Sequence, residues 1–169
     1  VTFDELQRRS AQFANLLKSQ GIGPGDCIAG LLPRTPNLVI VILGALRAGA
    51  VYQPLFTAFG PKAIQQRVRG SGAKLIVTDS TNRPKLDDVD NCPQVVTSGD
   101  VPPGELELGA LLVAQSETFV PVMRRGSDPF LMLFTSGTTG EPKGVVIPLE
   151  ALRAFRVYMQ YGIGLCPDD

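Results

Sequence analysis

Helical patterns alternate with short apolar runs over residues 2–79, and this alternation constrains the fold more than any other feature. Helices are predicted between capping or breaking residues at 2–21, 35–49 and 60–72. Each is followed by an apolar run typical of a buried strand, at 27–32, 50–55 and 75–79. Such alternation brings successive strands together in parallel and places the helices over the sheet. The sequence therefore predicts an α/β fold with a mostly parallel sheet flanked by helices.

Residues at the predicted helix ends support these boundaries. Thr2 and Glu5 have the spacing of a capping box, in which a threonine at the N-cap is followed three residues later by glutamate. Gly21 is typical of the residue just after a helix. Thr35 followed by Pro36 predicts an N-cap and a proline in the first helical position.

The apolar stretch over 38–56 is 19 residues long, so a membrane span has to be weighed. Arg47 lies near its middle, and a charge there is costly in a bilayer. Gly49 and Pro54 also interrupt the stretch. We therefore predict no membrane span.

Charge and histidine content exclude several classes of function. The 16 Lys and Arg residues balance 16 Asp and Glu residues, which argues against a nucleic-acid partner because such binding depends on clustered positive charge. The chain has no histidine, so it contains neither a Ser-His-Asp arrangement nor a histidine-ligated zinc site.

Three cysteines, Cys27, Cys92 and Cys166, lack the spacing of a metal site, and we predict no metal ligands among them. Their odd number is typical of a reduced chain, and no signal peptide is recognisable, so a cytoplasmic protein is expected. The sequence begins at Val1 without a methionine and stops after an element in progress. We expect it to be part of a longer chain.

The pattern changes after residue 79. Residues 80–129 are polar and rich in Asp, Pro and Asn, which predicts a surface excursion with a short strand near Val95 and a short helix over 106–113. Arg124 and Arg125 within it are expected to be solvated. A strand, a loop and a second strand are predicted over 130–148, followed by a truncated helix or loop over 149–169.

The loop between the last two predicted strands carries the chemistry. Residues 130–134 are five consecutive apolar residues, which predicts a strand buried on both faces. The loop that follows is rich in glycine and hydroxyl side chains, so its backbone N–H groups can approach an anion closely. Lys143 adds a compact positive charge. These features predict a phosphate cradle. The alternative is a surface hairpin made of turn-forming residues.

A Walker A loop is excluded by spacing, because that motif needs glycine before its lysine and Ser or Thr after it. Here Pro142 precedes Lys143 and Gly144 follows it. The run Phe134–Val145 instead resembles the phosphate-binding signature of the AMP-forming adenylating superfamily. That superfamily includes acyl-CoA synthetases, luciferases and the adenylation domains of peptide synthetases.

A second segment, Gly44–Leu55, also resembles an upstream motif of that superfamily, and the resemblance extends over nearly the whole chain. Residues 51–63 are most similar to the acetyl and short-chain acyl-CoA synthetases. One departure follows the loop. Many members carry a histidine shortly after the motif, whereas this chain has Ile147, Pro148 and Leu149.

The resemblance implies that residues 1–169 are the incomplete first part of the large N-terminal domain of an adenylating enzyme. Such an enzyme joins a small carboxylic acid to ATP, giving an acyl-adenylate and pyrophosphate, and then forms a thioester with coenzyme A. Mg²⁺ accompanies the ATP. The resemblance further implies that the ATP phosphates are bound by seven residues, namely Thr135, Ser136, Gly137, Thr138, Thr139, Gly140 and Lys143.

Arg83 is a further candidate that the resemblance suggests, as a contact for coenzyme A, although a solvated surface charge is the alternative. No catalytic residue is expected in this part of the chain. The family's acyl pocket, ribose-binding aspartate, hinge and C-terminal domain with its lysine have no counterpart here. We therefore expect the remaining C-terminal portion to be a necessary partner, and the 169 residues alone to have little or no activity.

Three other functions stay open on the sequence. The chain could belong to an adenylation domain for an amino acid or an aryl acid. It could be a nucleotide-binding module that works without ligase activity. It could also be a structural or interaction fragment with a vestigial loop, in which case an uncovered apolar face is expected.

Overall fold

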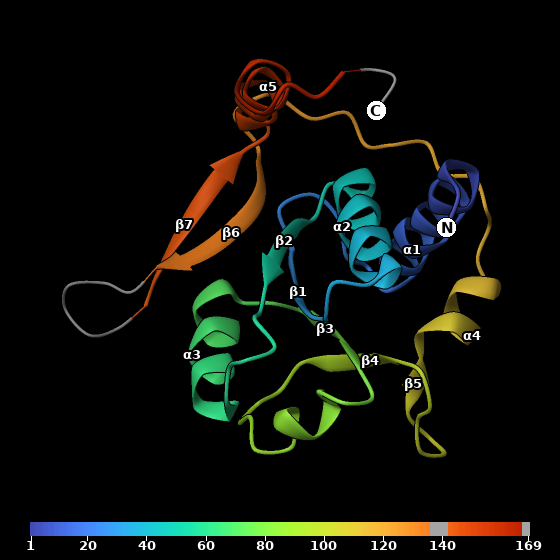
Figure 1. The fold of residues 1–169 in the computed structure, drawn as a ribbon. Coiled ribbons are helices and arrows are strands. Elements are labelled where there is room, and N and C mark those ends of the chain that lie inside the picture. Colours follow the sequence, from blue (N-terminus) through green and yellow to red (C-terminus); the bar gives the residue numbers. More distant parts are fainter. Residues whose placement is uncertain (136–141, 167–169) are drawn as a thin grey trace.

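A computed structural model describes residues 1–135 and 142–166, and the described strands form one seven-stranded sheet (Figure 1). The order across the sheet is β5-β4-β3-β1-β2-β6-β7. All neighbouring strands are parallel except β7, which is antiparallel to β6. The strand bounds are β1 Cys27–Leu31, β2 Val51–Pro54, β3 Leu75–Asp79, β4 Gln94–Ser98, β5 Leu106–Glu107, β6 Pro129–Thr135 and β7 Lys143–Pro148.

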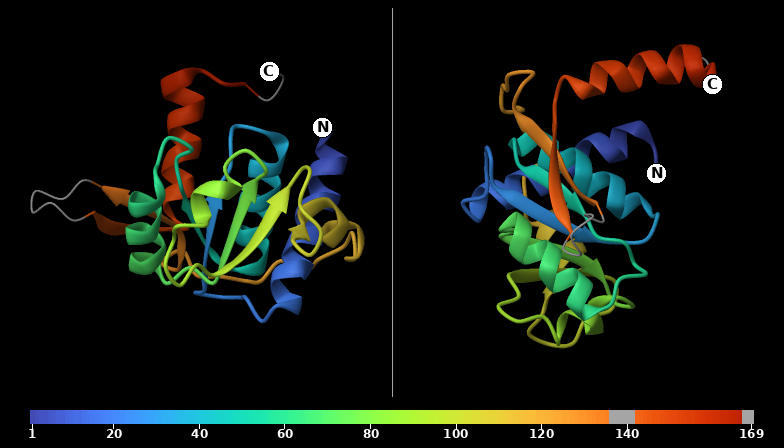
Figure 2. Two further views of the ribbon diagram at one scale, coloured as in Figure 1. Left: turned by 90° about the horizontal axis from the view of Figure 1, so that it is seen from below. Right: turned by 90° about the vertical axis from the view of Figure 1, so that its left-hand side faces the viewer.

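Helices cover both faces of the parallel part of this sheet (Figures 1 and 2). On one face, α1 (Phe3–Ser19), α2 (Pro36–Ala48) and α4 (Leu108–Val113) enclose the larger core with Ile28, Tyr52 and Leu75 of the strands. On the other face, α3 (Pro61–Ser71) and a 3-10 helix (Arg83–Leu86) pack on Ala29, Leu31 and Ile76. The predicted parallel sheet flanked by helices is confirmed.

The predicted helix ends are largely as expected. The Oγ1 atom of Thr2 accepts a hydrogen bond from the backbone N–H of Glu5 at 3.2 Å. Gly49 ends α2 with a φ of 77°, a left-handed conformation that favours glycine. Thr35 occupies the N-cap of α2 without a side-chain capping bond, so Pro36 in the first turn is what favours the helical start.

The long apolar stretch over 38–56 divides between two elements, because α2 ends at Ala48 and β2 begins at Val51. The first part of the stretch contributes to the core from α2, and the last part contributes from β2. None of the helices in the described parts of the chain is long and apolar enough to cross a bilayer.

Residues 80–129 contain the predicted short strand near Val95, which is β4 and pairs in parallel with β3 over its full length. They also contribute β5 at the edge of the sheet, so this segment is more than a surface excursion. Leu86, Val96 and Leu108 are buried in the two cores. These elements are short and separated by polar segments, so their apolar residues show no clear periodicity.

The helix predicted over 106–113 begins later than expected. Leu106 and Glu107 form β5, and α4 starts at Leu108. The Glu107 carboxylate caps this helix, because it accepts hydrogen bonds from the backbone N–H groups of Gly109 at 2.8 Å and Ala110 at 2.5 Å. A glutamate is an uncommon N-cap, which is why the sequence did not reveal the boundary.

The strands around the loop are less buried than predicted. Side chains of β6 are only partly buried, and most of β7 is exposed. Along β6 the register with β2 consists of one pair, Tyr52 with Leu131, so the hairpin extends away from the body of the sheet (Figures 1 and 2). Beyond β7, α5 (Ala151–Val157) and a π-helix (Tyr158–Ile163) have no buried residue.

Arg124, expected to be solvated, joins three segments of the chain. Its side chain is only 10% exposed. The guanidinium donates from Nη1 to the carbonyl of Gly49 at the end of α2, and from Nη2 to the carbonyl of Pro129 in β6 at 3.2 Å. Its Nε also donates to Asp128 at 3.0 Å. The backbone N–H of Arg125, together with the Arg124 guanidinium, lowers the pKa of Asp128.

We expect the substitution Arg124→Met to lower the free energy of unfolding by about 2 kcal/mol, because the carbonyl of Pro129 loses a charged donor in a partly buried site. The matched control is Arg125→Met, whose side chain is exposed. That variant should change stability by less than about 0.5 kcal/mol. Urea unfolding followed by circular dichroism measures both. Equal effects of the two substitutions would contradict the assigned role of Arg124.

Candidate phosphate-binding site

The candidate phosphate loop is carried by the end of β6 and the start of β7. Thr135 and Lys143 are paired in the antiparallel register, so they form the last rung of the hairpin before the loop. Both side chains are exposed. The other five predicted phosphate-binding residues lie outside the described residues, namely Ser136, Gly137, Thr138, Thr139 and Gly140. The described geometry therefore places the two ends of the predicted cradle.

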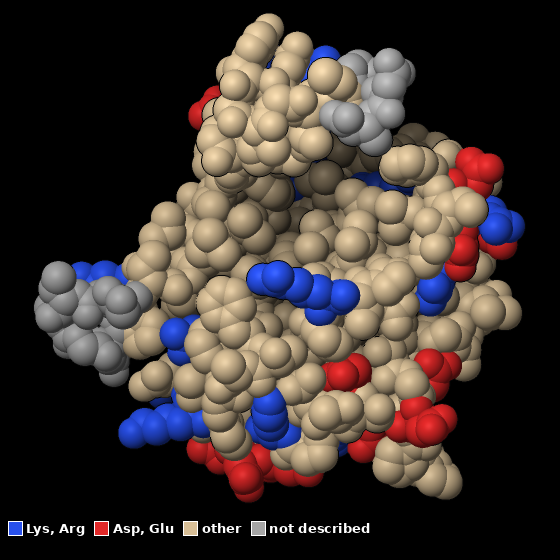
Figure 3. All heavy atoms as spheres, viewed as in Figure 1, with Lys and Arg blue, Asp and Glu red and all other residues tan. Residues whose placement is uncertain are grey.

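The end of α3 lies next to the loop-bearing end of the hairpin. A hollow of about 420 Å³ is lined by Gln66, Arg69 and Gly70 of α3 and by Pro142, the residue before Lys143. Arg69 is exposed in the last turn of the helix. Figure 3 shows basic side chains at this end of the hairpin and over α3, whereas acidic side chains gather mainly lower down and to the right. The surroundings of the loop therefore suit an anion.

Sequence reasoning missed Arg69 and Gln66. They lie about seventy positions before the loop, and no motif connects the two segments. The order of the elements gives no signal either, because α3 crosses from β2 to β3, on the side of β2 that lies away from β6.

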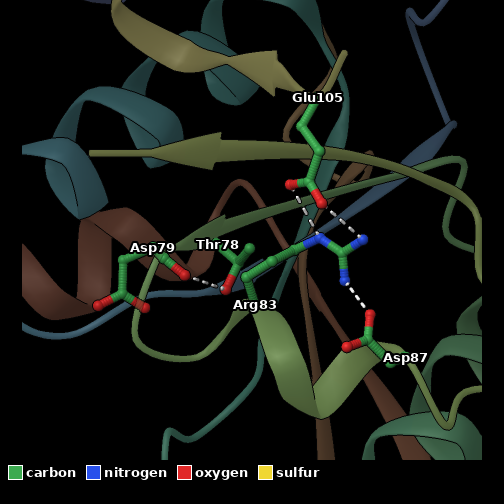
Figure 4. A network of polar contacts seen from close by, with 5 residues as sticks. All are labelled: Thr78, Asp79, Arg83, Asp87 and Glu105. Atoms are coloured by element: carbon green, nitrogen blue, oxygen red, sulfur yellow. Dashed lines mark hydrogen bonds and ion pairs between the residues drawn. The ribbon is translucent and has the colours of Figure 1, made fainter. Parts of the chain in front are cut away.

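Arg83, the candidate contact for coenzyme A, is held by two carboxylates (Figure 4). Its Nε and Nη2 contact Glu105 at 3.2 and 3.1 Å, and its Nη1 contacts Asp87 at 2.6 Å. The side chain is 25% exposed and borders a hollow of about 450 Å³. Three nitrogens of the guanidinium thus already contact acidic oxygens, which offsets much of its positive charge.

The neighbouring Lys85 is also engaged in contacts within the chain. Its Nζ donates to the backbone carbonyl of Thr57 and to the Oδ1 atom of Asn82 at 2.7 Å. The side chain of Asn82 in turn donates to Asp79 at the end of β3. The 3-10 helix is thereby tied to the end of the central sheet. The two cations after β3 and the candidate phosphate loop belong to different ends of α3 and are not brought together.

Cys27 has the properties of a core residue. It is 5% exposed in β1, and burial raises the pKa of its thiol to about 11, although a hydrogen bond with Ser71 opposes the rise. A thiol with such a pKa is almost entirely protonated at neutral pH, so it is a poor nucleophile. Within residues 1–135 and 142–166, no three Asp, Glu or Cys side chains gather as a candidate metal site.

Comparisons with known proteins agree on one family. The family described as AMP-binding enzyme matches residues 1–169. The crystal structure of an acyl-CoA synthetase from Brucella canis is 54% identical and covers 100% of this chain and 32% of that chain, with a TM-score of 0.92. ATP-bound MatB from Rhodopseudomonas palustris is 28% identical and covers 95% of this chain and 32% of that chain, with a TM-score of 0.81.

Among curated proteins, an acetyl-coenzyme A synthetase from Sodalis glossinidius is 32% identical over 168 residues, which is 86% of this chain and 26% of that protein. The chain therefore spans about a quarter of the length of this curated relative and about a third of the solved structures. The fold agrees with these structures over nearly all of the chain, including the strands that carry the loop.

Proposed function

The chain belongs to the AMP-binding enzyme family over residues 1–169, and from this membership we propose that it is the N-terminal part of an AMP-forming acid–thiol ligase of the acyl-CoA synthetase type. Its contribution is the loop that binds the phosphates of ATP. The observation that carries the proposal is the 54% identity, over the whole chain, with the Brucella canis acyl-CoA synthetase. The 32% identity with the acetyl-coenzyme A synthetase of Sodalis glossinidius favours a small carboxylic acid as the substrate of this enzyme.

Two half-reactions follow from this assignment. In the first, a carboxylate oxygen of the substrate attacks the α-phosphorus of ATP, the bond from that phosphorus to the bridging oxygen breaks, and pyrophosphate leaves. In the second, the thiol sulfur of coenzyme A attacks the acyl carbonyl carbon, the bond to AMP breaks, and the thiol proton is released. A carboxylate is already a competent nucleophile, so the first step needs no histidine base. Positioning and electrostatic stabilisation carry most of the catalysis.

The loop acts on the first half-reaction. We assign the β- and γ-phosphates of ATP to the seven residues Thr135, Ser136, Gly137, Thr138, Thr139, Gly140 and Lys143. Hydroxyl and backbone N–H groups donate to the phosphate oxygens, and Lys143 offsets the charge that builds up on the departing pyrophosphate. Mg²⁺ fits this arrangement as a cation held mainly by ATP, because it keeps waters and needs few protein ligands.

Arg83 is assigned to coenzyme A in the second half-reaction. Its position beside a hollow at the end of the sheet would let the guanidinium reach an anionic group while it keeps one carboxylate partner. In a cytoplasmic enzyme of this kind, the remaining groups of both half-reactions come from the C-terminal portion. The alternative is an adenylation domain for an amino or aryl acid.

We expect Lys143→Ala to reduce the rate of ATP–pyrophosphate exchange by about 100-fold in the protein at its natural length, because one charged donor to the leaving pyrophosphate is lost. The matched control is Lys62→Ala, which removes an exposed lysine at the start of α3 and should leave the rate unchanged. Lys143→Arg should restore part of the rate, since it keeps the charge. Full activity of Lys143→Ala would refute the assigned role.

The 169-residue chain on its own should release little or no pyrophosphate from ATP with short carboxylates. The physical reason is that the proposed acyl pocket and ribose contacts come from other segments. A coupled pyrophosphate assay measures this release, and the protein at its natural length is the positive control. Robust turnover by the 169 residues would overturn the requirement for the remaining portion. Micromolar binding of Mg-ATP without ligase activity at natural length would favour the stand-alone binding module.

Arg83→Gln should raise the KM for coenzyme A several-fold, because a cation near an anionic group of that substrate is removed. The same variant should keep the rate of ATP–pyrophosphate exchange, which does not involve coenzyme A. The two assays on one preparation therefore separate the assigned role from a general loss of folded protein. An equal decrease in both would contradict the assignment and favour a purely structural role for the contacts with Glu105 and Asp87.

A further inference from the structure

The hairpin that carries the candidate phosphate loop has little support from the sheet near its tip. The register between β2 and β6 consists of the pair Tyr52 and Leu131. The rungs nearer the loop, from Met132 with Val146 to Thr135 with Lys143, lie beyond that pair. An isolated two-stranded hairpin is marginally stable at best. The direction of its tip therefore depends on contacts outside the sheet.

Phe134 supplies such a contact. Its ring lies against Gly70 in α3, so closely that a Cβ atom placed on Gly70 would be 2.9 Å from the ring atom Cε1. On the opposite strand, a Cβ placed on Gly144 would be 3.3 Å from Cζ of the same ring. Gly144 is the register partner of Phe134. The two glycines thus leave a slot for the ring, whose Cε1 and Cζ atoms are the ring atoms nearest to both.

This slot is next to the loop and fixed to the core. Phe134 directly precedes Thr135, and Gly144 directly follows Lys143, so the ring lies one rung from both ends of the loop. The helix that supplies Gly70 is itself anchored, because Ile64 and Val68 of α3 are buried in the core. The ring therefore links the last rungs of the hairpin to a helix that packs on the central strands.

We propose that Phe134 is a positioning residue for the phosphate loop: its ring, seated between Gly70 and Gly144, fixes the direction in which Thr135 and Lys143 present the loop to ATP. The proposal rests on the proposed function, since it assumes that the loop binds ATP phosphates. The physical basis is that small misplacements of a positioned group cost large factors in rate. The ring supplies a rigid contact with α3 beyond the point where the register with β2 ends.

The test is a double-mutant cycle on Phe134 and Gly70 in the protein at its natural length. Phe134→Leu removes the ring, and Gly70→Ala pushes a methyl group into it. Each should raise the KM for ATP by about tenfold, while the KM for the carboxylate substrate stays the same. In the double variant the alanine methyl occupies space that the smaller leucine leaves. The fold increase of its KM for ATP over wild type should therefore be smaller than the product of the fold increases in the two single variants.

Thermal unfolding separates positioning from general stability. Alanine is favoured over glycine within a helix, and this gain offsets the cost of displacing the ring, so Gly70→Ala should change the melting temperature little even though it weakens the use of ATP. This variant keeps the proposal testable if Phe134→Leu fails to fold. The matched control is Val146→Ala, which changes a 51% exposed residue of the same hairpin and should leave both the KM for ATP and the melting temperature unchanged.

The outcomes distinguish a failure of the role assigned to Phe134 from a failure of the proposed function. A wild-type KM for ATP in Gly70→Ala, or single effects that simply multiply in the double variant, would overturn the role of Phe134 and leave the proposed function intact. An absence of any ATP–pyrophosphate exchange or ATP binding in the unaltered protein would overturn the proposed function, and the role of Phe134 with it. Positioning by Phe134 would also be rejected if both single variants had a raised KM for ATP together with a lower melting temperature, and if the decreases in melting temperature added in the double variant.

Discussion

Parallel pairing of β1 on both edges is the constraint on which the rest of the structure depends. Ile28, Ala29 and Gly30 pair with β2 on one side and with β3 on the other. Parallel neighbours cannot be joined by a tight turn, so each connection must cross over a face of the sheet as a helix. The connection from β1 to β2 and the connection from β2 back past β1 to β3 run in opposite directions across the sheet, so right-handed crossovers place α2 on one face and α3 on the other. The position of α3 beside β6 then brings its last turn to the loop-bearing hairpin.

The parts of the fold that follow from local patterns could be predicted from the sequence. Proline at the start of α2 and α3, and glycine at the ends of α1 and α2, mark boundaries through backbone preferences that are independent of distant contacts. Within 80–129 the sequence predicted a short strand near Val95 and a short helix, but not the burial of this segment in the two cores. Val96 and Leu108 are buried by tertiary contacts, and their short elements have too few residues for a periodic pattern.

The candidate site likewise has features that are local in the sequence and features that depend on distant contacts. The prediction of a phosphate cradle rests on a continuous run, because glycines, hydroxyl groups and one lysine between two apolar strands are local features. The contacts that hold the loop-bearing hairpin in place could not be predicted from the sequence. Arg124 meets Gly49, and Phe134 meets Gly70, across distances in sequence that no motif spans. Exposed arginine is the usual case, so the sequence offered no reason to expect that the Arg124 side chain would be 10% exposed.

The Arg124 contacts also have a consequence for the order of assembly. The Gly49 carbonyl lies 75 residues before its donor, so this bond closes a long loop of chain. Closing such a loop costs entropy that only preformed contacts repay. We therefore expect the contacts of Arg124 to form after the local contacts of α2, and the loop-bearing hairpin to be among the first segments to detach when the native state opens locally.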